Sequence, residues 1–352
     1  MKTSQKRTGL VLVVAALTTW LGTHAVAQQI TSLDFAPRLT IQSAVGTTNI
    51  IQYTNKLAPS DWAVLATLVV TQTPYTFLDL SSPPAAQRFY RVVDPNRPPA
   101  TTNMLWIPGG TFVMGSPTSE VERDGDEGQH TVTVSGFYMS RYLLTQGEYQ
   151  AVVGSNPSYF TTKDYFGNPI SPDLNRPVEQ VSWDDATNYC YRLNVREGRV
   201  GSGLVYRLPT ESEWEYACRA GTSTPFHYGP NLLSGMANFN GRYEYIGGVG
   251  TSNNPNGIYL GRTTAVGSYA PNGFGLYDMH GNVFEWCLDW YGTYPTGSVV
   301  NPRGPGAGTY RVVRGGDWRD LARYCRSARR YDGGPPYWSL YFGFRPVLAP
   351  GQ

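Results

Sequence analysis

The sequence has few of the residues from which hydrolytic, metal and nucleic-acid-binding sites are usually built. Its 352 residues include only four histidines, none in a His-Glu-x-x-His or other close metal-ligand spacing. Neither a Gly-x-Ser-x-Gly nucleophile elbow nor a glycine-rich phosphate loop is present. No cluster of lysine and arginine provides the positive footprint that phosphate binding requires. We therefore expect no nucleic-acid partner, and these hydrolase and nucleotide-binding chemistries have no support.

Long hydrophobic runs are also missing. No stretch approaches 18 uninterrupted apolar residues, so no transmembrane segment is expected in the mature chain. The run from Leu10 to Leu21 follows three basic residues and precedes small residues that end at Ala27, which is typical of a secretory signal. Residues 1–27 are therefore predicted to be a signal peptide, and the protein to be periplasmic, secreted or on the cell surface. Without the signal the chain keeps 25 of 28 basic and all 26 acidic residues, a formal charge of −1.

Cysteine is scarce and confined to the second half of the chain. The four cysteines are Cys190, Cys218, Cys287 and Cys325. Disulfides persist in the oxidising compartment that an exported protein enters. An even number of cysteines permits two bridges in three connectivities, and the spacing does not choose between them.

Glycine, proline and aromatic residues are abundant, which indicates a loop-rich fold held by bulky side chains. The chain without its signal exceeds what one hydrophobic core usually serves, so two domains are expected. Residues 28–95 contain five short runs with strand character and are predicted to form a small all-β module. Residues 96–103 read as a proline-rich linker, and residues 104–350 as the main domain.

Three helices are predicted in the main domain, each from its own start signal. Thr145 with Glu148 and Thr210 with Glu213 have the spacing of capping boxes, and Ser182 precedes a further helical pattern. Apolar residues recur at helical spacing after the second and third starts. This periodicity places Cys190 and Cys218 on buried helix faces.

Six blocks of the main domain occur in the order of the signature blocks of the formylglycine-generating enzyme (sulfatase-modifying factor) family, which the chain resembles from about Leu105 to Val347. The blocks are Ile107–Ser116, Pro177–Trp183, Tyr206–Glu215, Asn272–Trp286, Arg314–Trp318 and Gly343–Arg345. The resemblance implies an α+β, C-type-lectin-like fold with little regular secondary structure, preceded here by the all-β module. It does not fix the function, because function resides in sites carried by a fold.

The oxidases of this family hold Cu(I) with two cysteines spaced Cys-x4-Cys after a Gly-Gly-Ser block. Counting forward from the corresponding glycines puts these positions at Asp320 and Cys325, and Asp317 replaces the family's serine. Counting backward from Gly343 makes Cys325 a structural half-cystine instead. Either way one thiol at most remains beside a hard carboxylate, which Cu(I) does not favour. Copper is therefore not expected, and no catalytic residue is assigned.

The resemblance also implies disulfides and calcium. It favours a Cys218–Cys325 bridge, which leaves Cys190 with Cys287. A family calcium site falls on Asn282, the carbonyl of Val283 and Glu285, and hard oxygen ligands of this kind suit Ca²⁺. A second site falls on Asn238, the carbonyl of Phe239 and Asn256. The alternative is that Asn282 and Glu285 serve in a turn and a buried salt bridge.

These observations favour a binding protein of the family without oxidase activity, whose ligand is a protein or a carbohydrate outside the cytoplasm. Tyr243–Tyr245, Trp286–Trp290 and Tyr337–Trp338 are the candidate contact surface, and core packing is the alternative for each. The acidic residues from Glu120 to Glu127 are expected to be solvated. Two other functions remain open: an oxidase that converts a sulfatase cysteine to formylglycine, and a structural cell-surface protein.

Overall fold

The computed structural model describes residues 38–43, 45–46, 48–54, 63–79, 88–93 and 103–351. The predicted signal peptide and almost all of the predicted linker lie outside these residues. Within them no helix combines the length and the apolar character needed to cross a membrane.

The N-terminal part contains only strands among its described residues. Strand β1 (Arg38–Ile41) pairs with β4 (Tyr75–Leu78), and β2 (Thr48–Thr54) lies between β3 (Ala63–Val69) and β5 (Phe89–Val93). The five strands predicted here are thus confirmed. Contacts divide the chain into two compact units, residues 1–47 with 69–82 and residues 48–68 with 83–352. The domain limits at residues 27, 95 and 103 stay predictions.

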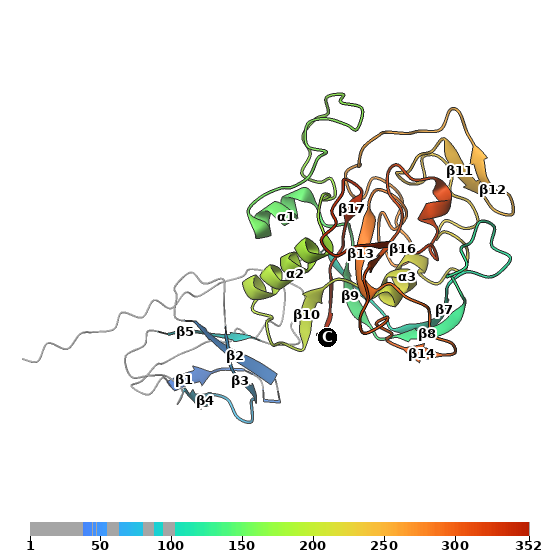
Figure 1. The fold of residues 1–352 in the computed structure, drawn as a ribbon. Helices are drawn as coiled ribbons and strands as arrows, with labels where there is room; N and C mark the ends of the chain where they lie inside the picture. Colours follow the sequence, from blue (N-terminus) through green and yellow to red (C-terminus); the bar gives the residue numbers. More distant parts are fainter. Residues whose placement is uncertain are drawn as a thin grey trace, which may run out of the picture. The chain divides into compact units, whose positions relative to one another are not determined.

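The main domain is built from short strands in several small sheets (Figure 1). One sheet has the order β10-β18-β9-β6 and another the order β16-β15-β13-β17, while β14-β8-β7 and β11-β12 complete the set. The strands are β6 (Met104–Ile107), β7 (Gly110–Met114), β8 (His130–Val134), β9 (Phe137–Ser140), β10 (Leu204–Arg207), β11 (Tyr243–Ile246), β12 (Gly250–Asn253), β13 (Phe284–Trp290), β14 (Val299–Val300), β15 (Arg311–Arg314), β16 (Tyr331–Gly333), β17 (Phe342–Gly343) and β18 (Val347–Pro350). Such short strands joined by long loops confirm the predicted α+β, C-type-lectin-like fold.

The three helices begin where the sequence predicts. They are α1 (Gln146–Val153), α2 (Trp183–Glu197) and α3 (Glu211–Arg219), and each starts with a complete capping box. In the box of α2, Ser182 is paired with Asp185. Helix α1 ends at Gly154 in the left-handed conformation, whereas α3 ends at Ala220 with φ of 46°.

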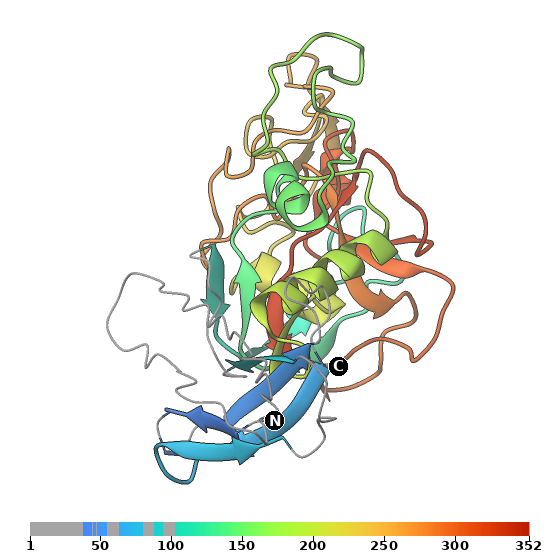
Figure 2. The ribbon, with the colours of Figure 1, turned by 90° about the vertical axis from the view of Figure 1, so that its left-hand side faces the viewer.

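The core of the main domain lies between these helices and the sheets. Helices α1 and α2 lie side by side, and α2 also packs on β10 (Figures 1 and 2). Cys190 and Cys218 are both buried, as the helical periodicity predicts. Trp214, Trp286 and Trp318 are completely buried as well. Large aromatic side chains therefore supply much of the interior of a fold that has little regular secondary structure.

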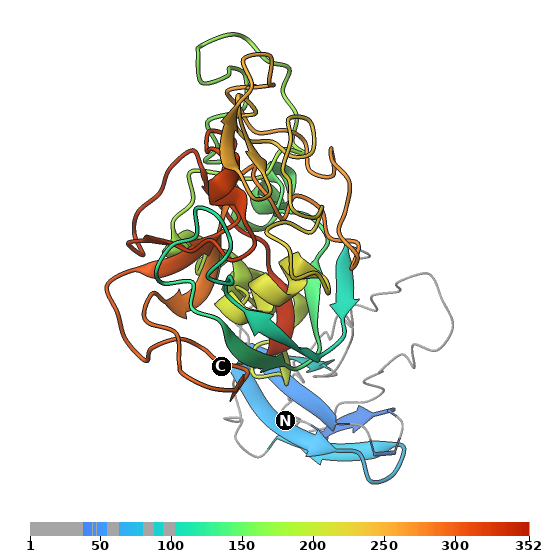
Figure 3. The same cartoon turned by 90° about the vertical axis from the view of Figure 1, so that its right-hand side faces the viewer.

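The β11–β12 hairpin lies beside a short 3-10 helix, η1 (Ala322–Cys325) (Figure 3). Phe226, Phe239 and Tyr245 form a separate apolar cluster with Ala322 and Cys325 at this place. The cluster fixes η1, and with it the segment on which the family's oxidases carry their thiols.

Candidate functional site

A glycine turn after β15 brings the family's active-site positions together. Gly315 and Gly316 have φ of 96° and 75°, which side chains rarely tolerate. A Cβ atom at Gly316 would lie 2.6 Å from the sulfur of Cys325. The glycine therefore allows the turn to rest directly on the thiol. Asp317, the next residue, is buried near Cys325.

Two carboxylates lie beside this thiol. Asp317 accepts hydrogen bonds from the backbone N–H groups of Arg319 at 2.6 Å and Asp320 at 3.2 Å. Burial raises the pKa of Asp317 to about 6. Burial and the neighbouring Asp317 raise the pKa of Asp320 well above its ordinary value, and the Oδ2 atom of Asp320 has no hydrogen-bond partner among the described residues. The predicted trio of Asp317, Asp320 and Cys325 is thus close together in space.

This site does not fit the copper of the family's oxidases. Burial, together with Asp320 and Asp317, raises the pKa of the Cys325 thiol well above its ordinary value, so the thiol stays protonated. Cu(I) favours soft thiolate ligands, and this position offers a single thiol beside two hard carboxylates. Within the described residues no three His, Cys, Asp or Glu side chains are grouped so that they could hold a metal ion. The site is a buried acid pair beside one protonated thiol.

Neither predicted disulfide is formed in the structure. All four cysteines are buried free thiols. Cys190 and Cys287 belong to two different core clusters, and so do Cys218 and Cys325. The sulfur of Cys218 lies 3.6 Å from the Oγ atom of Ser327, two residues beyond its expected partner.

Glu285 has an ion-pair partner rather than a free carboxylate. The guanidinium of Arg345 donates from Nε to Oε2 at 2.7 Å and from Nη2 to Oε1 at 3.0 Å, and both residues are completely buried. The alternative of a buried salt bridge is therefore what the structure contains. Both carboxylate oxygens of Glu285 are bonded to Arg345, and a calcium ion at Glu285 stays a prediction.

Of the other predicted calcium ligands, Asn238 and Asn282 lie close together. The Asn238 side chain donates to the Oδ1 atom of Asn282 at 3.1 Å, and the Asn282 N–H donates to the Asn238 carbonyl at 2.8 Å. Val283 and Phe239 follow these two residues directly and are buried. Asn256 is exposed, in the loop that follows β12. Calcium at these residues stays a prediction.

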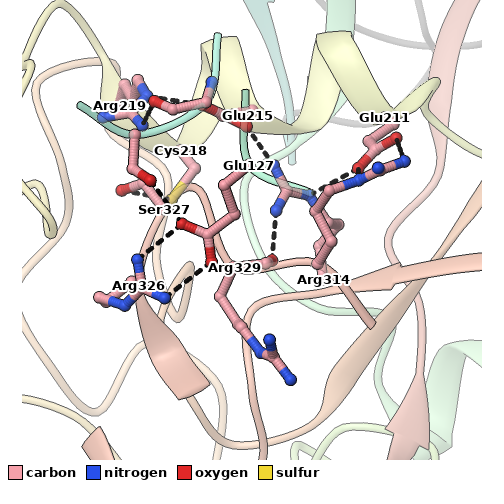
Figure 4. Close-up of polar contacts among 12 residues, drawn as sticks. Glu127, Glu211, Glu215, Cys218, Arg219, Arg314, Arg326, Ser327 and Arg329 are labelled. Atoms are coloured by element: carbon pink, nitrogen blue, oxygen red, sulfur yellow. Dashed lines mark hydrogen bonds and ion pairs between the residues drawn. The ribbon is translucent and has the colours of Figure 1, made fainter. Parts of the chain in front are cut away.

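The acidic loop is anchored, not solvated as expected. Glu127 is completely buried, and Glu120 is 8% exposed. Arg326 donates to Glu120 at 2.6 Å. Through two nitrogens it also donates to Glu127, at 2.7 and 2.8 Å (Figure 4). The arginine that balances the loop is about 200 residues away in the sequence, so local charge patterning could not reveal it.

A second group of buried ion pairs connects α3 to the C-terminal segment (Figure 4). Glu215 accepts from Arg219 at 2.9 Å and also bonds Arg314. Glu211 accepts two hydrogen bonds from Arg330, at 2.7 and 2.9 Å. Burial alone raises the pKa of Glu211, but Arg330 and Arg314 together hold it below its ordinary value. The acidic residues of the Tyr206–Glu215 block and the arginines after Arg314 are the sequence signal for this network.

Aromatic side chains reach the surface next to the acid pair. Buried Trp318 contacts Tyr165, with ring centroids 5.4 Å apart, and Tyr259 at 6.2 Å. The Arg319 guanidinium lies 4.3 Å from the ring centroid of Tyr341, which itself contacts Phe342. We call the following residues, each of which contacts Trp318, Phe342 or another member or adjoins one in the sequence, the aromatic strip: Tyr165, Phe166, Tyr259, Arg319, Tyr337, Trp338 and Tyr341.

Only part of the contact surface predicted from the sequence is exposed. Trp338 is 58% and Tyr337 51% exposed, so these two can meet a ligand. Tyr245 and Trp286 are in the core, as the core-packing alternative predicts, whereas Tyr243 is 40% exposed. The sequence prediction missed Tyr165 and Phe166, which are 46% and 57% exposed. Their position next to Trp318 depends on the tertiary fold.

The fold and this site define a C-type-lectin-like domain in which an acid pair and one thiol replace a pair of thiols. The chain belongs to the sulfatase-modifying factor family: the model of the sulfatase-modifying factor enzyme 1-like domain matches residues 90–350. The formylglycine-generating enzyme of Mus musculus is 31% identical over 314 residues, covering 74% of this chain and 80% of that protein. The formylglycine-generating enzyme of Streptomyces coelicolor is 31% identical, covering 71% of this chain and 90% of that protein.

Relatives that are not named as formylglycine-generating enzymes have about the same sequence identity to this chain. The serine/threonine-protein kinase pkn1 of Chlamydia pneumoniae is 31% identical, covering 72% of this chain and 39% of that protein. Among solved structures, Treponema denticola variable protein 1 has a TM-score of 0.56 and 26% identity, covering 76% of this chain and 97% of its own. PvdO from Pseudomonas aeruginosa has a TM-score of 0.54 and 30% identity, covering 70% of this chain and 94% of its own.

Proposed function

We propose that this chain is an exported binding protein of the sulfatase-modifying factor family that has no oxidase activity. The observation that carries the proposal is the set of groups at the former catalytic position. Asp317 and Asp320 lie there beside Cys325, the single thiol, and burial raises the pKa of all three groups. A soft Cu(I) ion needs thiolates, which these residues do not supply.

The aromatic strip is the surface that we propose for the ligand. Tyr337 and Trp338 present wide, rigid faces to solvent, and Phe166 with Tyr165 does the same beyond Trp318. Arg319 adds a cation beside Tyr341. Aromatic rings next to polar groups suit the faces of sugar rings and the side chains of peptides. The ligand is therefore a protein or a carbohydrate chain that lies along the strip.

An aldehyde assay tests the loss of oxidase activity. The purified chain is incubated with Cu(I) and a peptide that contains Cys-x-Pro-x-Arg, and the product is trapped with a hydrazide. We expect no aldehyde, while a formylglycine-generating enzyme treated in parallel gives one. Copper-dependent aldehyde formation by this chain would overturn the proposal in favour of the oxidase alternative.

Binding is tested on a glycan array and on a library of displayed peptides. We expect Trp338→Ala and Tyr337→Ala to weaken the ligand found in this way by tenfold or more, because exposed aromatic anchors dominate such contacts, each contributing about 2 kcal/mol. The matched control is Tyr191→Ala, since Tyr191 is 53% exposed on α2, outside the strip. Equal losses in all three variants would argue against the strip.

The structural alternative makes a different prediction about where the protein is found. A cell-surface component anchored by the β module stays with the cell pellet and is released when residues 28–95 are deleted. If the chain is a binding protein, the amount of it in the cell pellet should depend on the ligand being present there. That amount should also fall in the Trp338→Ala variant.

A further inference from the structure

A second concave site lies away from the aromatic strip, between the acidic loop and the segment that follows β13. Its cavity has a volume of about 640 Å³. This lies within the range of about 300–1,000 Å³ that small-molecule sites occupy. The walls come from Gly125, Asp126, Gly128, Gln129, residues 291–297 and Arg330. None of these residues belongs to the acid pair, to the strip or to the predicted calcium ligands.

The base of this cavity is held rigidly. Arg330 donates two hydrogen bonds to Glu211 and one, from Nη1, to the carbonyl of Gly292 at 2.9 Å. Its guanidinium lies 3.9 Å from the ring centroid of Tyr294 and 4.6 Å from that of Tyr291. The opposite wall belongs to the loop that Arg326 anchors through Glu127. Both walls are thus fixed without a ligand, which lowers the entropic cost of binding.

The charges around the cavity disfavour the binding of both anions and cations. Three of the five N–H donors of Arg330 are bonded to protein oxygens, and its charge is paired with that of Glu211, which weakens its attraction for an anion. The carboxylate of Asp126 faces the same space and repels an anion. A cation gains little from Asp126, because Arg330 lies 3.7 Å from its Oδ2 atom and the Tyr291 hydroxyl is bonded to that atom.

The groups that remain accessible are neutral donors and acceptors. The amide of Gln129 and the hydroxyls of Thr293 and Thr296 line the cavity, and these three residues are exposed. The Asp126 side chain, which is 32% exposed, also lines the cavity. Glycines at 125, 128, 292 and 297 also bring backbone amides to the wall. A ligand with several hydroxyl groups on a compact ring matches this mixture, since each hydroxyl both donates and accepts.

We infer that this cavity, which we name the Asp126 pocket, binds a neutral pyranose sugar through Asp126, Gln129 and the threonine hydroxyls. The inference does not depend on the role of the aromatic strip, because the two surfaces share no residue. A single sugar unit in a shallow, water-accessible pocket binds with a dissociation constant on the order of 1 mM.

Isothermal titration of the full chain tests the inference, with methyl α-D-glucopyranoside, methyl α-D-galactopyranoside, methyl α-D-mannopyranoside and N-acetyl-D-glucosamine as probes. We expect saturable binding of at least one probe. Gln129→Ala and Asp126→Ala each weaken that binding by tenfold or more, and Trp338→Ala leaves it unchanged. Gln129 is exposed, so its variant reports on the pocket even where Asp126→Ala disturbs the loop.

Three results would overturn the inference. They are an absence of saturable binding for all four probes, binding that neither pocket variant weakens, and inorganic phosphate displacing the bound sugar. Loss of sugar binding in Trp338→Ala alone would assign the sugar to the aromatic strip and would also overturn the pocket. The aldehyde assay is independent of all these outcomes, so a failure of the pocket is distinguishable from a failure of the proposed function.

Discussion

Arg326 binds Glu127 through two parallel hydrogen bonds, from Nη2 to Oε1 at 2.7 Å and from Nη1 to Oε2 at 2.8 Å. Both side chains are almost completely buried. Glu127 also accepts from the hydroxyl of Ser116 at 2.7 Å. This one guanidinium therefore joins the acidic loop to the end of η1, and it fixes one wall of the Asp126 pocket at the same time.

Arg326→Met tests this connection. Removing the guanidinium leaves Glu120 and Glu127 buried without their partner, so we expect a loss of about 3–5 kcal/mol in the free energy of unfolding. Arg323→Met is the control, because Arg323 is 36% exposed and its distance to Glu122 is 3.8 Å. An exposed pair of this kind contributes about 0–1 kcal/mol. Urea denaturation that gives equal losses for the two variants would show that the anchor is unimportant.

Asp289 gives the stability of the domain a pH dependence. It is 4% exposed and accepts a hydrogen bond from the N–H of Glu211 at 2.9 Å. Burial, followed by the negative charge of Glu211, raises the pKa of Asp289 from 3.8 to about 8. Because the folded-state pKa lies above the unfolded value, this group stabilises the fold fully below pH 3.8, and that contribution is lost as the pH rises towards 8.

Asp289→Asn removes the titration while keeping an acceptor oxygen. Between about pH 4 and pH 8 we expect the free energy of unfolding of the variant, relative to that of the native chain, to rise by up to about 1.4 kcal/mol per pH unit. Asp184→Asn, at an exposed position in the first turn of α2, is the control and leaves the slope unchanged. Unfolding free energies measured across this range decide the matter. Parallel profiles for the native chain and Asp289→Asn would contradict the shift.

The burial of the cysteines predicts how the chain reacts with thiol reagents. Burial raises the pKa values of Cys190 and Cys218 to about 12, so neither forms a reactive thiolate in the folded chain. We expect the native protein to react with no equivalent of a thiol reagent and the denatured protein to react with four, one for each free cysteine. Recovery of a bridged peptide pair under non-reducing conditions would show instead that a disulfide forms on export.

Calcium is tested by thermal unfolding. Bound calcium stabilises the folded state, by about 2.7 kcal/mol at a concentration one hundred times the dissociation constant. We expect Ca²⁺ to raise the midpoint of unfolding, Asn282→Ala to reduce that rise, and Mg²⁺ to be a poor substitute because it demands a more rigid octahedral site. Identical midpoints with Ca²⁺ and with a chelator would contradict the predicted calcium sites.

Local sequence determined the helix starts and several strands of this protein. The capping boxes at Thr145 and Thr210 bring together residues three positions apart, and the strands follow short apolar runs. Such signals depend on neighbours in the chain, so they could be predicted.

The sequence by itself also determined that the segment resembling the family's active site holds at most one thiol, because the type of side chain at a position does not depend on the fold. Only the tertiary structure decided which side chains are exposed and which are buried against a distant partner. It buried Glu127 against Arg326 and Glu285 against Arg345, kept the four thiols apart, and left Trp338 exposed while Trp286 became core. The partners in these contacts lie up to about 200 residues apart, and burial and charge balance arise from such distant contacts rather than from local pattern.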